Sequence, residues 1–202
     1  MEDIVFESVR TVTQEEFARL VEERARTGDL HEYELLNGRI VMTPPAGFPH
    51  GALEVAVCAV LLRFVQERGL GLVFGPSQGF TLPSGDTLSP DAAFVSNERW
   101  RAGPAPADGE FIRIVPDLVV EILSPSTASR DRGEKRGIYE RNGVREYWLV
   151  DARARTVTRF VLRANAYDAG RTFDDGASVE SEILAGLSVP VSSLWLTAPA
   201  RT

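Results

Sequence analysis

Residues 116–125 read PDLVVEILSP, a nearly continuous apolar run between two prolines. Such a run predicts a central strand that is buried on both faces. An acid, Glu121, lies inside it. A carboxylate in an apolar layer is costly unless it is paired or binds a cation. The run therefore predicts a strand in the middle of a sheet and a buried carboxylate, Glu121, that is paired or binds a cation.

The elements around this strand predict a mixed sheet. Downstream, a helix over about 130–142 ends at Gly143 and precedes a strand over 145–151. A strand–helix–strand passage of this length allows a parallel crossover. Upstream, a shorter strand over 91–95 begins with Asp91. If the strands are neighbours, Asp91 and Glu121 can lie at one end of the sheet.

The N-terminal part predicts a helix and a hairpin. Thr13 and Glu16 form a capping box for a helix that extends to about Arg26. Two strands, 32–36 and 39–43, flank an Asn-Gly turn, which is a strong hairpin signal. Apolar residues at helical spacing then predict a long helix over about 50–67. Together these elements predict an α/β fold with a mixed central β-sheet flanked by helices.

Composition favours one globular domain. The chain has 202 residues, of which 44% are hydrophobic and 25% charged. We expect a single domain over 1–202, with the N-terminal helix and hairpin at 11–43, a core over about 50–165 and a C-terminal extension over 166–202. The single cysteine, Cys58, lies in an apolar helical run and is expected in the core, so no disulfide framework exists.

Charge and hydropathy limit the class of protein. The net charge of −7 and the pI near 5.0 count against a broad basic surface for nucleic acid. The N-terminus lacks the apolar segment of a signal peptide, and the longest apolar run, 55–62, is too short to cross a bilayer. We expect a cytoplasmic protein without a membrane partner.

Three carboxylates and a lysine resemble the site of a metal-dependent phosphodiesterase. Hydrolysis of a phosphodiester needs a cation that neutralises developing charge and activates water, and Mg²⁺ prefers oxygen ligands. Asp91 and Glu121 are the expected ligands, with the backbone carbonyl of Ile122 as a further one. Lys135, on the core-facing side of its helix, is expected to orient the water or stabilise the transition state. Glu34, on the first hairpin strand, could bind a second metal or act as a general base.

Each of these residues also has a structural interpretation. Asp91 could simply be a residue of the turn or of the strand start. Glu34 could face water beside its hairpin, and Lys135 could be solvated, as most helical lysines are. His50 is more often an ordinary first residue of a helix than a metal ligand. Asp131 and Tyr139, four residues on either side of Lys135, are further candidates for the site. The combination, rather than any one residue, favours a catalytic site.

The chain resembles the bacterial family described as putative restriction endonucleases (the Uma-two family), within the PD-(D/E)XK nuclease superfamily. The resemblance covers roughly residues 11–195. The matching segments are 33–35 with 37–39, Pro45 and His50, 89–91, 116–127, Asp131 with Lys135 and Tyr139, and 143–151.

This resemblance implies a restriction-endonuclease-like core, Mg²⁺-dependent cleavage of DNA with Mn²⁺ as a substitute, and a homodimer. It also implies that Asp91 and Glu121 bind the metal and that Glu34 is the N-terminal acid. Leu123 stands where the superfamily has a lysine two residues after the second acid. The resemblance suggests that Lys135 fills that place.

Two other interpretations remain open at the level of sequence. The acidic charge and the missing strand lysine are compatible with an inactive nuclease fold that binds DNA or protein. A hydrolase of smaller phosphate esters would use the same kind of ligands. The joint presence of Glu34, Asp91, Glu121 and Lys135 favours a Mg²⁺-dependent endonuclease over either alternative.

Overall fold

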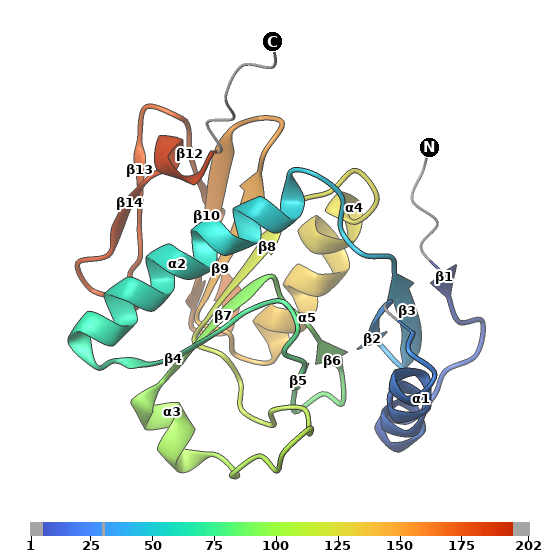
Figure 1. Cartoon of the computed structure of the whole chain (residues 1–202). Helices are drawn as coiled ribbons and strands as arrows, with labels where there is room; N and C mark the ends of the chain where they lie inside the picture. The colour runs from blue at the N-terminus through green and yellow to red at the C-terminus, as the bar shows by residue number, and fades with distance from the viewer. Residues whose placement is uncertain (1–5, 30, 196–202) are drawn as a thin grey trace.

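The computed structural model describes residues 6–29 and 31–195 (Figure 1). The first five and the last seven residues of the expected single domain lie outside this range. In the described part of the chain, no helix is long and apolar enough to cross a membrane.

The central sheet is mixed, as predicted. Its strands, in spatial order, are β11 (Ala166–Tyr167), β10 (Thr156–Arg163), β9 (Glu146–Asp151), β8 (Leu118–Ile122), β7 (Ala92–Ser96) and β4 (Gly71–Phe74), and β12 (Arg171–Phe173) also pairs with β10. Strands β8 and β9 are parallel, and the other pairs are antiparallel. All five residues of β8 are buried, so the apolar run around Glu121 is the middle of the sheet.

A second sheet is built on the N-terminal hairpin. Its strands are β1 (Phe6–Glu7), β3 (Arg39–Thr43), β2 (Glu32–Leu36), β6 (Thr87–Leu88) and β5 (Phe80–Thr81). Asn37 and Gly38 both have positive φ, 51° and 78°, as the predicted Asn-Gly turn requires. Strand β5 belongs to this sheet and not to the central one. It does so because β5 and β6 pair across the turn at Gly85, which extends the hairpin sheet.

Helix α1 (Gln14–Arg26) packs on the hairpin sheet. Its capping box is present: the Thr13 hydroxyl accepts from the amide of Glu16, and the Glu16 carboxylate accepts from the amide of Thr13. Phe17 is fully buried against Leu35 and Ile40. The predicted N-terminal helix is thus confirmed.

Helix α2 (His50–Arg68) crosses one face of the central sheet (Figure 1). Leu53, Val57 and Leu61 bury their side chains there, together with residues of β7, β8 and β9. Gly69 ends the helix in the left-handed conformation, with φ 60°. Because α2 begins at His50, this residue and the first helical turn reach the end of the sheet where β7 begins.

The helix on the opposite face contains a π-helical turn. It comprises α4 (Ala128–Arg130), the π turn η1 (Asp131–Lys135) and α5 (Arg136–Arg141), where the sequence predicted a plain helix over 130–142. Asp131 and Lys135 are both buried in this turn. Single π turns inside α-helices occur frequently at functional sites.

Three further features complete the fold. Ser96 caps a short helix, α3 (Asn97–Ala102), which the sequence did not predict. The C-terminal segment forms β13 (Ser178–Glu180), β14 (Ser188–Pro190) and a 3-10 turn, η2 (Val191–Leu194), whose apolar residues join the core beneath α2. Cys58, which was expected in the core, packs against it but is only half-buried, and its thiol lies 3.6 Å from the carbonyl of Asp91.

Candidate functional site

Asp91 and Glu121 lie at the same end of the central sheet. Strands β7 and β8 are antiparallel, and Ala92 pairs with Val120. Continuing this register by one residue places Asp91 opposite Glu121, because β7 begins where β8 ends. Asp91 Oδ2 accepts a hydrogen bond from the amide of Ile122, which holds the carboxylate against the end of β8.

Glu121 is held by two donors in the protein interior. Its side chain is 4% exposed. Glu121 Oε1 accepts hydrogen bonds from the Tyr139 hydroxyl at 2.8 Å and from Lys135 Nζ at 3.2 Å. Burial raises the pKa of Glu121 well above its ordinary value, and the charge of Lys135 opposes that rise. Lys135 is therefore the neighbour that favours the ionised form of this acid.

Lys135 lies at the centre of the carboxylates. Its Nζ is 2.9 Å from Glu34 Oε1, 3.2 Å from Glu121 Oε1 and 3.8 Å from Asp131 Oδ1. Burial alone would lower the pKa of Lys135, but the three carboxylates raise it well above its ordinary value. The predicted core-facing orientation of Lys135 is confirmed, and the side chain carries a positive charge.

Glu34 joins the hairpin sheet to this cluster. Besides the contact with Lys135, Glu34 Oε1 accepts a hydrogen bond of 3.0 Å from the amide of Ser89. Asp131 approaches from η1 and is almost fully buried. Among the described residues, Asp131 Oδ1 has no hydrogen-bond partner. Burial raises the pKa of Asp131, and Lys135 counteracts the rise.

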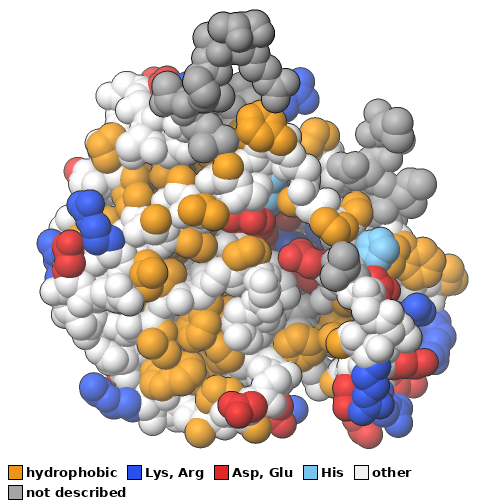
Figure 2. Space-filling model, viewed as in Figure 1, with side chains coloured by type: hydrophobic (Ala, Val, Ile, Leu, Met, Phe, Trp, Pro, Cys, Tyr) orange, Lys and Arg blue, Asp and Glu red, His pale blue; other side chains and the backbone are white. Residues whose placement is uncertain are grey.

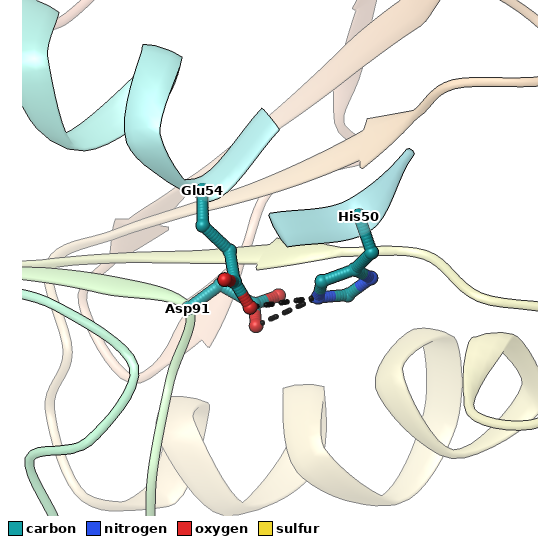
Figure 3. Close-up of side chains that lie close together, drawn as sticks. All are labelled: His50, Glu54 and Asp91. Carbon is teal, nitrogen blue, oxygen red and sulfur yellow. Dashed lines mark hydrogen bonds and ion pairs between the residues drawn. The ribbon is translucent and has the colours of Figure 1, made fainter. Parts of the chain in front are cut away.

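His50 and Glu54 reach the site from the first two turns of α2 (Figure 3). His50 Nε2 lies 3.0 Å from Asp91 Oδ1 and 3.3 Å from Glu54 Oε1. Burial would lower the pKa of His50, but the two carboxylates raise it to about 10. One ligand atom from each of the three residues lies within 4.8 Å of the others, so the group could hold a metal ion.

A cleft of about 1230 Å³ opens over these residues. Figure 2 shows acidic side chains gathered near the centre of this face. The cleft is bordered by the segments 43–51, 121–128 and 151–154. Arg130, Arg132 and Arg153 also contribute to its lining. Glu32, a solvent-exposed acid, also lines the cleft, and desolvation there, followed by the charges of Glu34 and Asp91, raises its pKa above the ordinary value.

The structure brings all of the predicted side chains together. Hydrogen bonds and ion pairs link these side chains in two groups at the same end of the sheet. The first group consists of Glu34, Glu121, Asp131, Lys135 and Tyr139. The second group consists of His50 and Asp91. Ile122 lies between the two groups and lines the cleft.

Sequence reasoning missed Glu54, Glu32 and one property of Lys135. Glu54 follows His50 by four residues on a helix, a spacing that places both on one face. Lys135 is the only lysine in the sequence, in which Lys and Arg together number 22. Arginine therefore supplies the other basic side chains. The one ammonium group, that of Lys135, lies among the three carboxylates of Glu34, Glu121 and Asp131. An ammonium is a compact point charge, unlike the planar guanidinium of arginine.

The mixed sheet with helices on both faces defines the class of fold, and the acid–lysine cluster lies at one end of this sheet. The family model described as "Uma2: Putative restriction endonuclease" matches residues 14–192, and the chain belongs to this family.

A solved structure shares the fold. It is described as a "putative nuclease belonging to DUF820 from Anabaena variabilis ATCC 29413", and it superposes with a TM-score of 0.72 at 22% sequence identity. The match covers 91% of this chain and 97% of that chain. No curated protein matches the chain. The predicted fold class is thus confirmed.

Proposed function

We propose that this protein is a Mg²⁺-dependent DNA endonuclease of the PD-(D/E)XK type, with Asp91, Glu121, Lys135 and Glu34 in its active site. The observation that carries this proposal is the position of Lys135. Its ammonium lies 3.2 Å from Glu121 and 2.9 Å from Glu34, at the end of the sheet where β7 begins with Asp91. Family membership supports a nuclease as the general class.

The donor set fits a hard divalent cation. Asp91 and Glu121 offer carboxylate oxygens at the end of neighbouring strands, and the Ile122 carbonyl is the third expected ligand. Mg²⁺ usually takes one or two carboxylates and keeps several waters. When bound, the metal would supply Lewis-acid stabilisation and a more acidic water. The cleft above the site has a volume of about 1230 Å³, enough to hold a phosphodiester group together with such waters.

Lys135 is proposed to take the role of the lysine that the superfamily has on the second strand. Position 123 is a leucine here, and Lys135 reaches the same acid from the following helix. Its raised pKa keeps the ammonium charged at neutral pH, so it can stabilise negative charge that develops on a phosphoryl oxygen. Glu34 orients this ammonium and is the candidate general base.

DNA is the proposed substrate, and a homodimer is the proposed assembly, since two active sites are useful for cutting a duplex. The second candidate function is an inactive DNA-binding or protein-binding module. One observation favours it: basic side chains at the cleft are already paired within the chain, Arg132 with Asp151 at 2.8 Å and Arg130 with Glu7 at 3.6 Å. These pairs leave fewer free charges for a phosphate backbone.

A cleavage assay tests the proposal. Supercoiled plasmid and single-stranded DNA are incubated with the protein and Mg²⁺, Mn²⁺ or EDTA, beside the variants Asp91→Asn, Glu121→Gln and Lys135→Met. Glu67→Gln is the matched control, because Glu67 is an exposed acid at the far end of α2. We expect metal-dependent cleavage that the three site variants abolish and the control retains.

The opposite result would favour the inactive module. Cleavage that persists in Asp91→Asn and Glu121→Gln would come from a contaminant or another site. If neither substrate is cut, Mg²⁺ binding is measured by calorimetry in the same variants. Absence of binding that depends on Asp91 and Glu121 would refute the proposed metal site.

A further inference from the structure

We infer that Phe48 stacks on an unpaired base of the DNA substrate, so that the cleft prefers single-stranded or locally unpaired DNA to a closed duplex. This inference rests on the proposed function, because it names the form of DNA that the proposed site takes. Phe48 is 85% exposed, more than any other aromatic side chain among the described residues, and it lines the cleft. Its ring therefore contributes little to the packing of this chain and is available to a ligand.

Phe48 is held beside the proposed site. It lies in the segment that joins β3 to α2 (Figure 1). The amide of His50 donates a hydrogen bond of 3.0 Å to the Gly47 carbonyl, which closes a turn around Phe48. His50 in turn places its Nε2 3.0 Å from Asp91 Oδ1. Since two residues of chain span at most about 7 Å, the backbone of Phe48 lies next to the site.

The cleft offers different surfaces to a phosphate and to a base. Its acids lie deep: the side chains of Asp91 and Glu121 are 13% and 4% exposed. Figure 2 shows hydrophobic side chains beside the acidic ones on this face. Apolar residues line the cleft from two segments, with Pro44, Pro45 and Ala46 before α2 and Leu123 and Pro125 after β8. An unpaired nucleotide has both a charged phosphate and an open base face, so it matches both surfaces.

The basic side chains of the cleft argue against a duplex. Four lysine and arginine side chains line it, and three of them form ion pairs within the chain: Arg130, Arg132 and Lys135. The fourth, Arg153, is exposed and has no ion pair with any residue that the structure describes.

This scarcity of unpaired positive charge matters because the two forms of DNA bind proteins differently. A duplex hides the faces of its bases and owes most of its affinity to phosphates that lysine and arginine contact. A single strand exposes its base faces, and stacking on an aromatic ring adds affinity for any base. The cleft is therefore better equipped for an unpaired strand, with Phe48 as the stacking ring.

Binding to three probes of equal length tests the inference. The fluorescently labelled probes are oligothymidine, a duplex, and a single-stranded backbone without bases, and binding is followed by fluorescence anisotropy. Ca²⁺ replaces Mg²⁺, and electrophoresis verifies that the probes stay intact. The full-length variants are Phe48→Ala, Phe48→Leu and Phe48→Trp. Phe6→Ala is the matched control, because Phe6 is 55% exposed and does not line the cleft.

We expect the wild-type protein to bind oligothymidine more tightly than the duplex or the base-free backbone. Phe48→Ala should weaken binding of oligothymidine about 5- to 150-fold, the range for one lost stacking contact, and leave binding of the base-free backbone unchanged. Phe48→Trp should keep the affinity, whereas Phe48→Leu, which is apolar without an aromatic face, should lose it. Phe6→Ala should bind as the wild type does. Thermal melts should be unchanged, since both phenylalanines are exposed.

Four results would overturn the inference. Equal affinity of the wild type for oligothymidine and the base-free backbone would mean that no base is stacked. Equal affinity of wild type and Phe48→Ala for oligothymidine would place the bases elsewhere. Tighter binding of the duplex than of oligothymidine would refute the preference. Loss of a dimer in Phe48→Ala, seen by light scattering with DNA affinity unchanged, would assign the ring to a contact between subunits.

A failure of the proposed nuclease function would look different. No probe would then be cut in Mg²⁺, while oligothymidine would still bind in a manner that depends on Phe48.

Discussion

Lys135 Nζ lies 3.2 Å from Glu121 Oε1, although the two residues are 14 positions apart and belong to a helix and a strand. Both side chains are buried, so neither charge is solvated by bulk water. A buried ion pair is weak evidence for stability as such, but removal of one partner leaves a costly unpaired charge. The pair therefore couples the stability of the fold to the integrity of the site.

Lys135→Met should affect both properties. The remaining carboxylates would be buried without a cation, which is expected to cost about 3–5 kcal/mol in free energy of unfolding. DNA cleavage should fall by about 10²–10³-fold, because a group that stabilises transition-state charge is lost. Urea denaturation and initial cleavage rates measure the two effects. Wild-type rates in a folded Lys135→Met protein would refute a catalytic role for this side chain.

The single lysine allows its pKa to be measured directly. In protein labelled with ¹³C-lysine, the one ε-carbon resonance should stay at the position of the charged form beyond pH 10.5, the ordinary value, because three carboxylates raise the pKa. In a Glu34→Gln/Glu121→Gln double variant, burial persists while two of the charges are gone. The pKa should then fall, and titration should occur at lower pH than in wild type. An unchanged titration in the double variant would contradict the electrostatic account.

His50 should make the metal-free protein less stable at high pH. Its pKa is raised from 6.5 to about 10 in the folded state, so the folded protein binds a proton more tightly than the unfolded chain does. The resulting stabilisation is fully present below pH 6.5 and is lost as the pH rises through about 10.

Thermal melts in EDTA measure this effect by comparing wild type with His50→Gln. The wild type should have the higher Tm at pH 6.5, and the difference should shrink by pH 10. For a chain of this size, about 1 kcal/mol corresponds to roughly 2–4 °C. Groups other than His50 titrate in both proteins and largely cancel. A Tm difference that is constant over this range would mean that His50 is not protonated in the folded state.

Glu146 should be essential for stability but not part of the site. This buried acid accepts hydrogen bonds from the indole of Trp148 and from the amides of Glu182 and Ile183, which ties β9 to the C-terminal segment. Glu146→Ala would leave these donors without an acceptor, at an expected cost of about 2–4 kcal/mol in free energy of unfolding. Glu180→Ala, at an exposed acid on β13, should change stability by less than about 0.5 kcal/mol.

Urea denaturation provides the comparison. If Glu146→Ala were as stable as Glu180→Ala, the C-terminal segment would be held by its apolar residues alone. Cleavage activity per folded molecule should be unchanged in both variants, since Glu146 does not line the cleft.

Local patterns predicted much of the framework. The capping box at Thr13, the Asn37-Gly38 turn and the apolar run around Glu121 each depend on residues close together in the chain. Such signals act through hydrogen bonds and periodicity that do not need distant partners. The strand–helix–strand passage likewise predicted the parallel pair β8 and β9.

Other features depended on contacts between distant segments. The π turn at Asp131, the short helix α3 and the second sheet were not predicted, because tertiary packing overrides local preference at these places. In the sequence, Glu54 cannot be distinguished from an ordinary acid on a helix. Only the approach of α2 to the start of β7 brings Glu54 near Asp91.

Sequence alone identified the acids and the lysine that belong together, because a carboxylate in an apolar strand needs a cationic partner or a metal ion to offset its desolvation. The tertiary structure decided which atoms they contact. Asp91 directs one oxygen to the amide of Ile122 and the other to His50, and Lys135 reaches Glu34 on another sheet. These contacts arise from the register of β7 on β8 and from the packing of helices on opposite faces, which a one-dimensional pattern does not encode.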